Sequence, residues 1–110
     1  GILTTCYLWP KQGTLASSEK AQKEVFDLYM DFYRDEPFVK VVSAPPQTKQ
    51  TWGNNNCMIH PVIQNHTGRV VVVSCIDNLV KGAAGQAIQN MNLMFNLPEV
   101  MGLETLAVYP

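Results

Sequence analysis

Charged residues are scarce in this sequence, since Asp, Glu, Lys and Arg make up only 15% of its 110 residues. Typical globular domains have about 25%, so we expect another protein surface to cover part of this chain. The formal net charge of −1 gives no electrostatic reason to expect nucleic acid or an anionic membrane as a partner. No apolar run comes near the ~20 residues of a membrane span, and no secretory leader pattern is present.

Cysteine is also sparse, with only Cys6, Cys57 and Cys75. An odd number without secretory features indicates reduced thiols in the cytoplasm, or in a plastid or mitochondrial matrix if the source is eukaryotic. The surrounding patterns place each cysteine in a strand, with no adjacent base or helix N-terminus to lower its pKa. We therefore predict structural roles for all three. Cys57 and Cys75 together with His60 and His66 match no common zinc spacing, so no metal site is predicted.

Other catalytic motifs are missing as well. There is no Ser-His-Asp order, no phosphate-binding loop and no GxGxxG dinucleotide fingerprint. A strand pattern starts at the second residue, so we expect the chain to be a piece of a longer protein.

What is present is a pattern of alternating strands and helices in the order β-α-β-β-β-β-α. We expect strands at 2–9, 38–42, 48–52, 57–63 and 69–76, and helices at about 18–36 and 78–95. This order predicts an α+β fold with helices packed on one face of a mixed, largely antiparallel sheet. The unbroken valine run in 69–76 indicates a central strand covered on both faces. Pro61 favours an edge position or a bulge for its strand.

The helix at 78–95 has two unlike sides. Its apolar stripe comprises Val80, Ala84, Ala87, Ile88, Met91, Met94 and Phe95. Gly82, Gly85 or Gln86, and Gln89 lie on the other side, and no charge occurs between Lys81 and Glu99. A small, amide-rich second side is not suited to open water. It indicates either close packing or contact with a ligand, for which the helix N-terminus offers N–H groups and a partial positive charge.

Several segments resemble one enzyme family. Residues 77–87 (DNLVKGAAGQA) and 89–95 (QNMNLMF) are similar to the C-terminal signature of N-acetyl-gamma-glutamyl-phosphate reductase, a family of the semialdehyde dehydrogenase-like superfamily. Further matches occur in the expected order at 1–5, 36–39, 47–49 and 68–72. Residues 77–87 also resemble aspartate-semialdehyde dehydrogenase more loosely. A relative of that enzyme, or a non-catalytic dimerisation module, stays as an alternative interpretation.

The resemblance implies an NADP-dependent oxidoreductase of arginine biosynthesis. The whole enzyme would convert N-acetyl-L-glutamyl 5-phosphate to the 5-semialdehyde, with a cysteine thiolate displacing phosphate and NADPH supplying hydride. Such an enzyme has an N-terminal Rossmann domain for NADP and a second domain, like the C-terminal domain of glyceraldehyde-3-phosphate dehydrogenase, for substrate binding and dimerisation. Residues 1–110 resemble only the C-terminal part of that second domain, so the Rossmann domain is missing. A homo-oligomer is also implied.

The resemblance also implies where site residues lie. The family's nucleophilic cysteine and its catalytic histidine both belong upstream of Gly1, so we predict that this chain has no catalytic residue and is inactive alone. Cys6 has the Cys-Tyr pair of the nucleophile segment but lacks the Pro-Thr that follows. The helix at 78–95 is expected to pack on the missing Rossmann domain beside the nicotinamide end of the cofactor. The implied cofactor contacts are Asn78, Lys81, Gly82, Ala83 and Ala84.

The chain departs from the family pattern in two turns. Residues 54–56 are three asparagines where the family has Gly-Ser-aromatic, and Asn96 stands where it has glycine. These departures put the local shape of the two turns in question.

Overall fold

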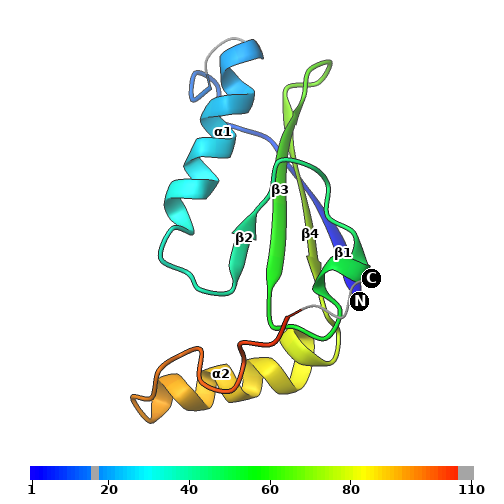
Figure 1. Ribbon diagram of the computed structural model, residues 1–110. Coiled ribbons are helices and arrows are strands. Elements are labelled where there is room, and N and C mark those ends of the chain that lie inside the picture. Colours follow the sequence, from blue (N-terminus) through cyan, green and yellow to red (C-terminus); the bar gives the residue numbers. More distant parts are fainter. Residues whose placement is uncertain (16–17, 107–110) are drawn as a thin grey trace.

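The computed structural model describes residues 1–15 and 18–106 of the chain. It shows a four-stranded mixed sheet with helices, and so confirms the α+β class (Figure 1). The elements are β1 (Ile2–Leu8), α1 (Ser18–Phe32), β2 (Val39–Val41), the 3₁₀ helix η1 (Thr48–Thr51), β3 (Cys57–Gln64), β4 (Arg69–Ile76), the π-helical turn η2 (Val80–Ala84) and α2 (Gly85–Met94).

The strand order is β1-β4-β3-β2, so the valine-rich β4 is interior as predicted. It pairs antiparallel with both β1 and β3, while β2 adds a short parallel pairing to β3. Neither face of β4 is covered along its whole length: Val70 and Val72 are buried on one face and Cys75 on the other, whereas Ser74 on the first face and Val71 and Val73 on the second are half-buried. The expectation that both faces are covered is therefore wrong within this chain.

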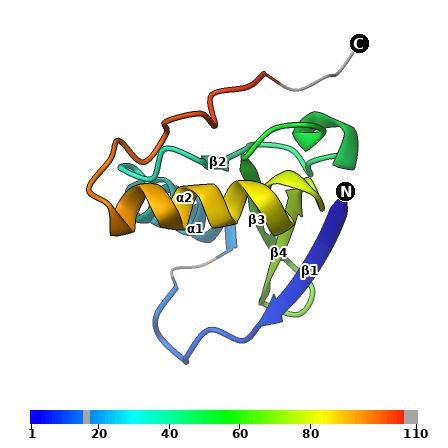
Figure 2. The same ribbon diagram turned by 90° about the horizontal axis from the view of Figure 1, so that it is seen from below.

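The hydrophobic core lies between α1 and one face of the sheet. Ala21 and Val25 on α1 pack against buried side chains of β3 and β4, namely Ile59, Ile63, Val70 and Val72. α2 lies elsewhere, across the end of the sheet where β3 begins and β4 ends (Figures 1 and 2). Within the described residues, no helix is long and apolar enough to cross a membrane.

Pro61 lies in an interior strand but at a locally open edge. β2 pairs with β3 only as far as Ile59, so β3 has no strand neighbour on that side at Pro61. The side chain of Gln22 takes the neighbour's place, donating from Nε2 to the Pro61 carbonyl oxygen at 3.1 Å and accepting from the Ile63 N–H at 2.8 Å. The missing N–H of proline therefore costs the sheet no hydrogen bond.

The segment at 48–52 was expected to be extended, and this prediction is wrong. Thr48–Thr51 forms the 3₁₀ helix η1. A capping box holds its start, in which the side chains of Gln47 and Gln50 each accept a hydrogen bond from the backbone N–H of the other residue. The Gln50 side-chain oxygen accepts from the Gln47 N–H at 2.8 Å. Such local side-chain bonds give the backbone an alternative to sheet pairing.

The predicted C-terminal helix is present, but the structure buries the opposite side from the one that its apolar stripe indicates. Gly85, Gln89 and Asn92 are the buried residues of α2. The stripe is exposed from Ala84 onward, with Met94 79% exposed and Phe95 70% exposed. The helix ends as expected, since Asn96 has a φ of +54°, a conformation that asparagine tolerates better than most residues.

Candidate functional site

The start of the α2 region is anchored by one carboxylate. Asp77 Oδ1 accepts the N–H groups of Leu79 and Val80, each at 2.7 Å, and its Oδ2 accepts the Gly53 N–H at 3.1 Å. These backbone bonds, from Gly53 and Val80 above all, lower the pKa of the Asp77 carboxyl. Asp77 therefore caps the helix start and also ties it to the turn at 53–56.

The first turn after this cap is wider than an α-helix. The Gly82 N–H donates to the Asp77 carbonyl oxygen at 2.8 Å, and the Ala84 N–H donates to Leu79 at 2.9 Å, both spanning five residues. Bonds of this spacing define a π turn, a feature found often at functional sites. Such a turn spreads the backbone of η2 and gives its small residues a broad outer surface.

Four of the five predicted cofactor contacts share this outer surface. Asn78, Gly82, Ala83 and Ala84 are all exposed. The surface is small and uncharged, and a Cβ at Gly82 would lie 3.2 Å from the Asp77 carbonyl oxygen. The turn therefore presents its backbone with little side-chain cover.

Lys81, the fifth candidate, points inward instead. Its Nζ donates to Gln89 Oε1 at 2.6 Å and lies 5.5 Å from the centre of the Phe38 ring. Burial lowers the pKa of Lys81, while Cys57 and Glu99 act in the opposite direction. Lys81 is thus a half-buried cation at the junction of β3 and α2.

The small side of α2 fits closely against the turn at 53–56. A Cβ at Gly85 would overlap Asn55 Oδ1 and lie 2.7 Å from Val80 Cγ1. Asn55 is fully buried, and its Nδ2 donates to Gln89 Oε1 at 3.0 Å. Gln89 in turn donates to Glu99 Oε1 at 2.6 Å. Of the two explanations left open for this side, close packing holds at Gly85 and Gln89.

Asn55 was not among the predicted site residues. The signal that could have found it is the unusual run of asparagines at 54–56, which the sequence analysis noted only as a departure in a turn. Asn55 Oδ1 has no hydrogen-bond partner among the described residues and points at Gly85. A side chain larger than hydrogen at position 85 would meet this oxygen directly.

The three cysteines differ in exposure. Cys6 is exposed, Cys57 is half-buried and Cys75 is buried. Burial raises the pKa of the Cys57 thiol, with Lys81 opposing the shift in part. Within residues 1–15 and 18–106, no group of three or more His, Cys, Asp or Glu side chains could hold a metal ion.

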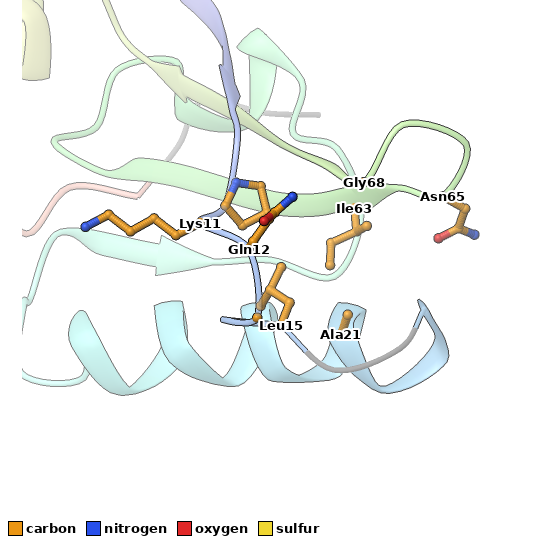
Figure 3. A pocket seen from close by; sticks show the side chains of 9 residues that line it. Lys11, Gln12, Leu15, Ala21, Ile63, Asn65 and Gly68 are labelled. Atoms are coloured by element: carbon orange, nitrogen blue, oxygen red, sulfur yellow. The ribbon is translucent and has the colours of Figure 1, made fainter.

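A pocket of about 280 Å³ lies at the other end of the molecule, between α1, the loop at 10–15 and the β3–β4 hairpin (Figure 3). Its wall is formed by Leu15, Ala21 and Ile63, while Lys11 and Asn65 extend in opposite directions away from it. Since two of its polar lining side chains, Lys11 and Asn65, extend away from its wall, the pocket carries no argument for a ligand site.

The mixed sheet with α1 packed on one face is the architecture expected of a dimerisation domain of the dehydrogenase class. A family model described as "Semialdehyde dehydrogenase, dimerisation domain" matches residues 1–78, and the chain belongs to this family. Proteins named N-acetyl-gamma-glutamyl-phosphate reductase are similar over the whole chain, at 51% identity in Dehalococcoides mccartyi, 49% in Heliobacterium modesticaldum and 51% in Symbiobacterium thermophilum. The resemblance seen in the sequence is thereby confirmed. The chain spans about 30% of the length of these relatives (30%, 31% and 31%).

Proposed function

We propose that this chain is the C-terminal part of the second domain of an N-acetyl-gamma-glutamyl-phosphate reductase that uses NADP. The whole protein would reduce N-acetyl-L-glutamyl 5-phosphate to the 5-semialdehyde. Support comes from about 50% identity to proteins of that name across the full chain. The reactive cysteine and histidine would come from the upstream part of the protein, so the chain alone is proposed to be inactive. A cytoplasmic location, without nucleic acid or membrane partners, is proposed for the whole enzyme.

The observation that carries the cofactor part of this proposal is the surface at the start of α2. An exposed turn of small residues lies directly before an exposed apolar stripe. The stripe includes Ile88, Met91 and Met94, which are 38%, 45% and 79% exposed. Apolar contacts of this kind would hold α2 on the Rossmann domain, and the turn would then face the cofactor bound there.

The residues of the turn fit one end of a dinucleotide. Gly82, Ala83 and Ala84 have little or no side chain, so a flat ring could approach the backbone closely. Asn78 is exposed and offers both an amide donor and an acceptor. NADPH, when bound, would supply the hydride. This chain would orient the nicotinamide end and exclude water from it.

Lys81 would contribute from behind the turn. Its Nζ lies on Gln89 and beside the Phe38 ring, so its positive charge sits beneath the proposed cofactor surface. It would favour negative charge at the site through its field, and it would hold the turn in place through Gln89.

The proposal is tested by enlarging Gly82 in the full-length protein. We expect Gly82→Leu to raise the KM for NADPH about tenfold while the KM for the acyl phosphate changes little. Asn90→Leu is the matched control, because Asn90 is exposed on α2 beyond the turn. Kinetics would be measured together with the melting temperature of each variant.

An unchanged KM for NADPH in a folded Gly82→Leu variant would refute the cofactor contact. Absence of reductase activity in the full-length parent would refute the enzyme assignment and favour the non-catalytic dimerisation module.

A further inference from the structure

Gln89 joins three segments that are far apart in the sequence. Its Oε1 accepts hydrogen bonds from Lys81 Nζ at 2.6 Å and from Asn55 Nδ2 at 3.0 Å. Its Nε2 donates to Glu99 Oε1 at 2.6 Å, and the residue is only 8% exposed. The π turn η2, the turn at 53–56 and the stretch after α2 therefore meet at one buried amide.

The two ends of the Gln89 amide face opposite charges. Its oxygen faces the Lys81 ammonium, and its nitrogen faces the Glu99 carboxylate. Hydrogen bonds to ionised groups are stronger than neutral ones. Turning the amide over would set its NH₂ group against the ammonium and its oxygen against the carboxylate. The two charges therefore select one orientation of the amide.

Residues 97–105, the return segment, hold Glu99 in place. The segment runs back alongside α2 toward the sheet (Figures 1 and 2). Asn92 Nδ2 donates to the carbonyl oxygen of Glu99 at 3.0 Å. At the far end of the segment, Thr105 Oγ1 donates to the Gly53 carbonyl oxygen at 3.2 Å. The return segment is therefore fixed both to α2 and to the turn after η1.

The Gln89 amide also supports the π turn from beneath. Lys81 belongs to η2 and directly precedes Gly82, whose N–H bonds to the Asp77 carbonyl oxygen across five residues. Turns of this spacing are rare compared with α-helical turns, so contacts outside the turn have to favour it. The bond between Lys81 and Gln89 is a contact of this kind.

We propose that Gln89 is a positioning residue for the surface that faces the cofactor, and that the return segment acts on this surface through Glu99. Glu99 orients the Gln89 amide, the amide holds Lys81, and Lys81 keeps the π turn in its wide form. The identity of the ligand, NADPH, rests on the proposed function, whereas the coupling between Gln89 and the turn does not.

The test removes the hydrogen bonds of Gln89 in the full-length protein without shortening its side chain. We expect Gln89→Met to raise the KM for NADPH about tenfold, while the KM for the acyl phosphate stays near that of the parent. Glu99→Gln keeps an acceptor but loses the charge, so the KM for NADPH should rise less, about threefold. Asn90→Leu on α2 and Glu104→Gln in the return segment are matched controls, because both residues are exposed. Both controls should leave the KM for NADPH unchanged.

A second measurement follows the turn itself and needs neither cofactor nor reductase activity. In the cofactor-free protein, hydrogen exchange at the N–H groups of Gly82 and Ala84 should be at least about tenfold faster in Gln89→Met than in the parent. The N–H groups of β4 should exchange at parent rates, because the pairing of the sheet does not depend on Gln89. A merely structural loss would instead speed exchange in both places.

Two results would overturn the proposal outright: parent-like exchange at Gly82 and Ala84 in folded Gln89→Met, or an equal rise in exchange throughout β4. Faster exchange at the turn with an unchanged KM for NADPH would overturn the role in cofactor binding. Faster exchange at the turn in a full-length protein that does not bind NADPH would support the coupling and refute the proposed function.

Discussion

Helices α1 and α2 both have apolar residues at helical spacing, yet they bury opposite kinds of surface. α1 buries Ala21 and Val25 against the sheet. α2 buries Gly85, Gln89 and Asn92 and leaves its larger apolar side chains in solvent. The polar side of α2 is covered because it meets hydrogen-bonding partners. Asn92 Nδ2, for example, donates at 3.0 Å to the carbonyl oxygens of both Glu99 and Met101.

This difference teaches what a hydrophobic period can and cannot predict. A period identifies which residues share one face of a helix, but it does not identify the surface that covers that face. In α1 the covering surface is in the same chain. In α2 the apolar face is exposed in the described part of the chain, and the amide face holds an otherwise irregular C-terminal segment. Buried amides are stable here because most of their polar atoms are paired.

The largest effect should come from placing one charge on each helix. Val25→Asp puts a carboxylate at a site that is 3% exposed, and it should cost at least about 3 kcal/mol of unfolding free energy. Met94→Asp, at a site that is 79% exposed, should change the stability of the chain by less than about 0.5 kcal/mol. Urea unfolding followed by circular dichroism measures both. Equal losses would mean that α2 also buries its apolar stripe within the chain.

A smaller effect should distinguish the two glycines at the start of α2. Helix propensity alone favours Gly85→Ala by about 1 kcal/mol. Because the added Cβ would overlap Asn55, we expect a net loss of about 2 kcal/mol instead. Gly82→Ala, on the exposed turn, should stay within about 1 kcal/mol of the parent. A stabilised Gly85→Ala variant would contradict the close fit between α2 and the turn at 53–56.

The smallest effect concerns the Asp77 cap. Asp77→Asn should cost about 1 kcal/mol at neutral pH, because charge-assisted bonds to three backbone N–H groups are weakened. The folded-state pKa of Asp77 is lowered, so its contribution is complete above the unfolded pKa of about 3.9 and is lost as the pH falls through the folded pKa. The stability difference between parent and variant should therefore shrink in acid. A difference that is constant from pH 7 to pH 2 would contradict this role.

The sequence predicted most elements of the fold because their signals are local. The predicted helix at 78–95, for example, starts after Asp77 and ends before Asn96, and both ends depend on residues a few positions apart. It failed at η1, where local glutamine bonds replaced the expected strand. The sequence did not decide between an edge position and a bulge for the strand with Pro61, because the open edge there is completed by Gln22, a residue 39 positions earlier.

In the candidate site, too, some features follow from local sequence and others depend on the tertiary structure. Asn78, Gly82, Ala83 and Ala84 are neighbours in the sequence, so a shared exposed turn could be foreseen, although their contact with a cofactor stays a prediction. The asparagine run at 54–56 marked the turn, but the contact of Asn55 with Gly85 and the inward direction of Lys81 could not be foreseen. Both depend on the distance between the turn at 53–56 and a helix that starts about thirty residues later, and no local pattern sets that distance.

By itself, then, the sequence determined the α+β class, the positions of most helices and strands, and the family resemblance, because these follow from local propensity and residue order. Only the tertiary structure decided which side of α2 is covered inside the chain. The apolar side stays exposed because no apolar surface among residues 1–15 and 18–106 covers it. The amide side was buried because Asn55, Glu99 and the carbonyl oxygen of Met101 lie where its hydrogen bonds can form.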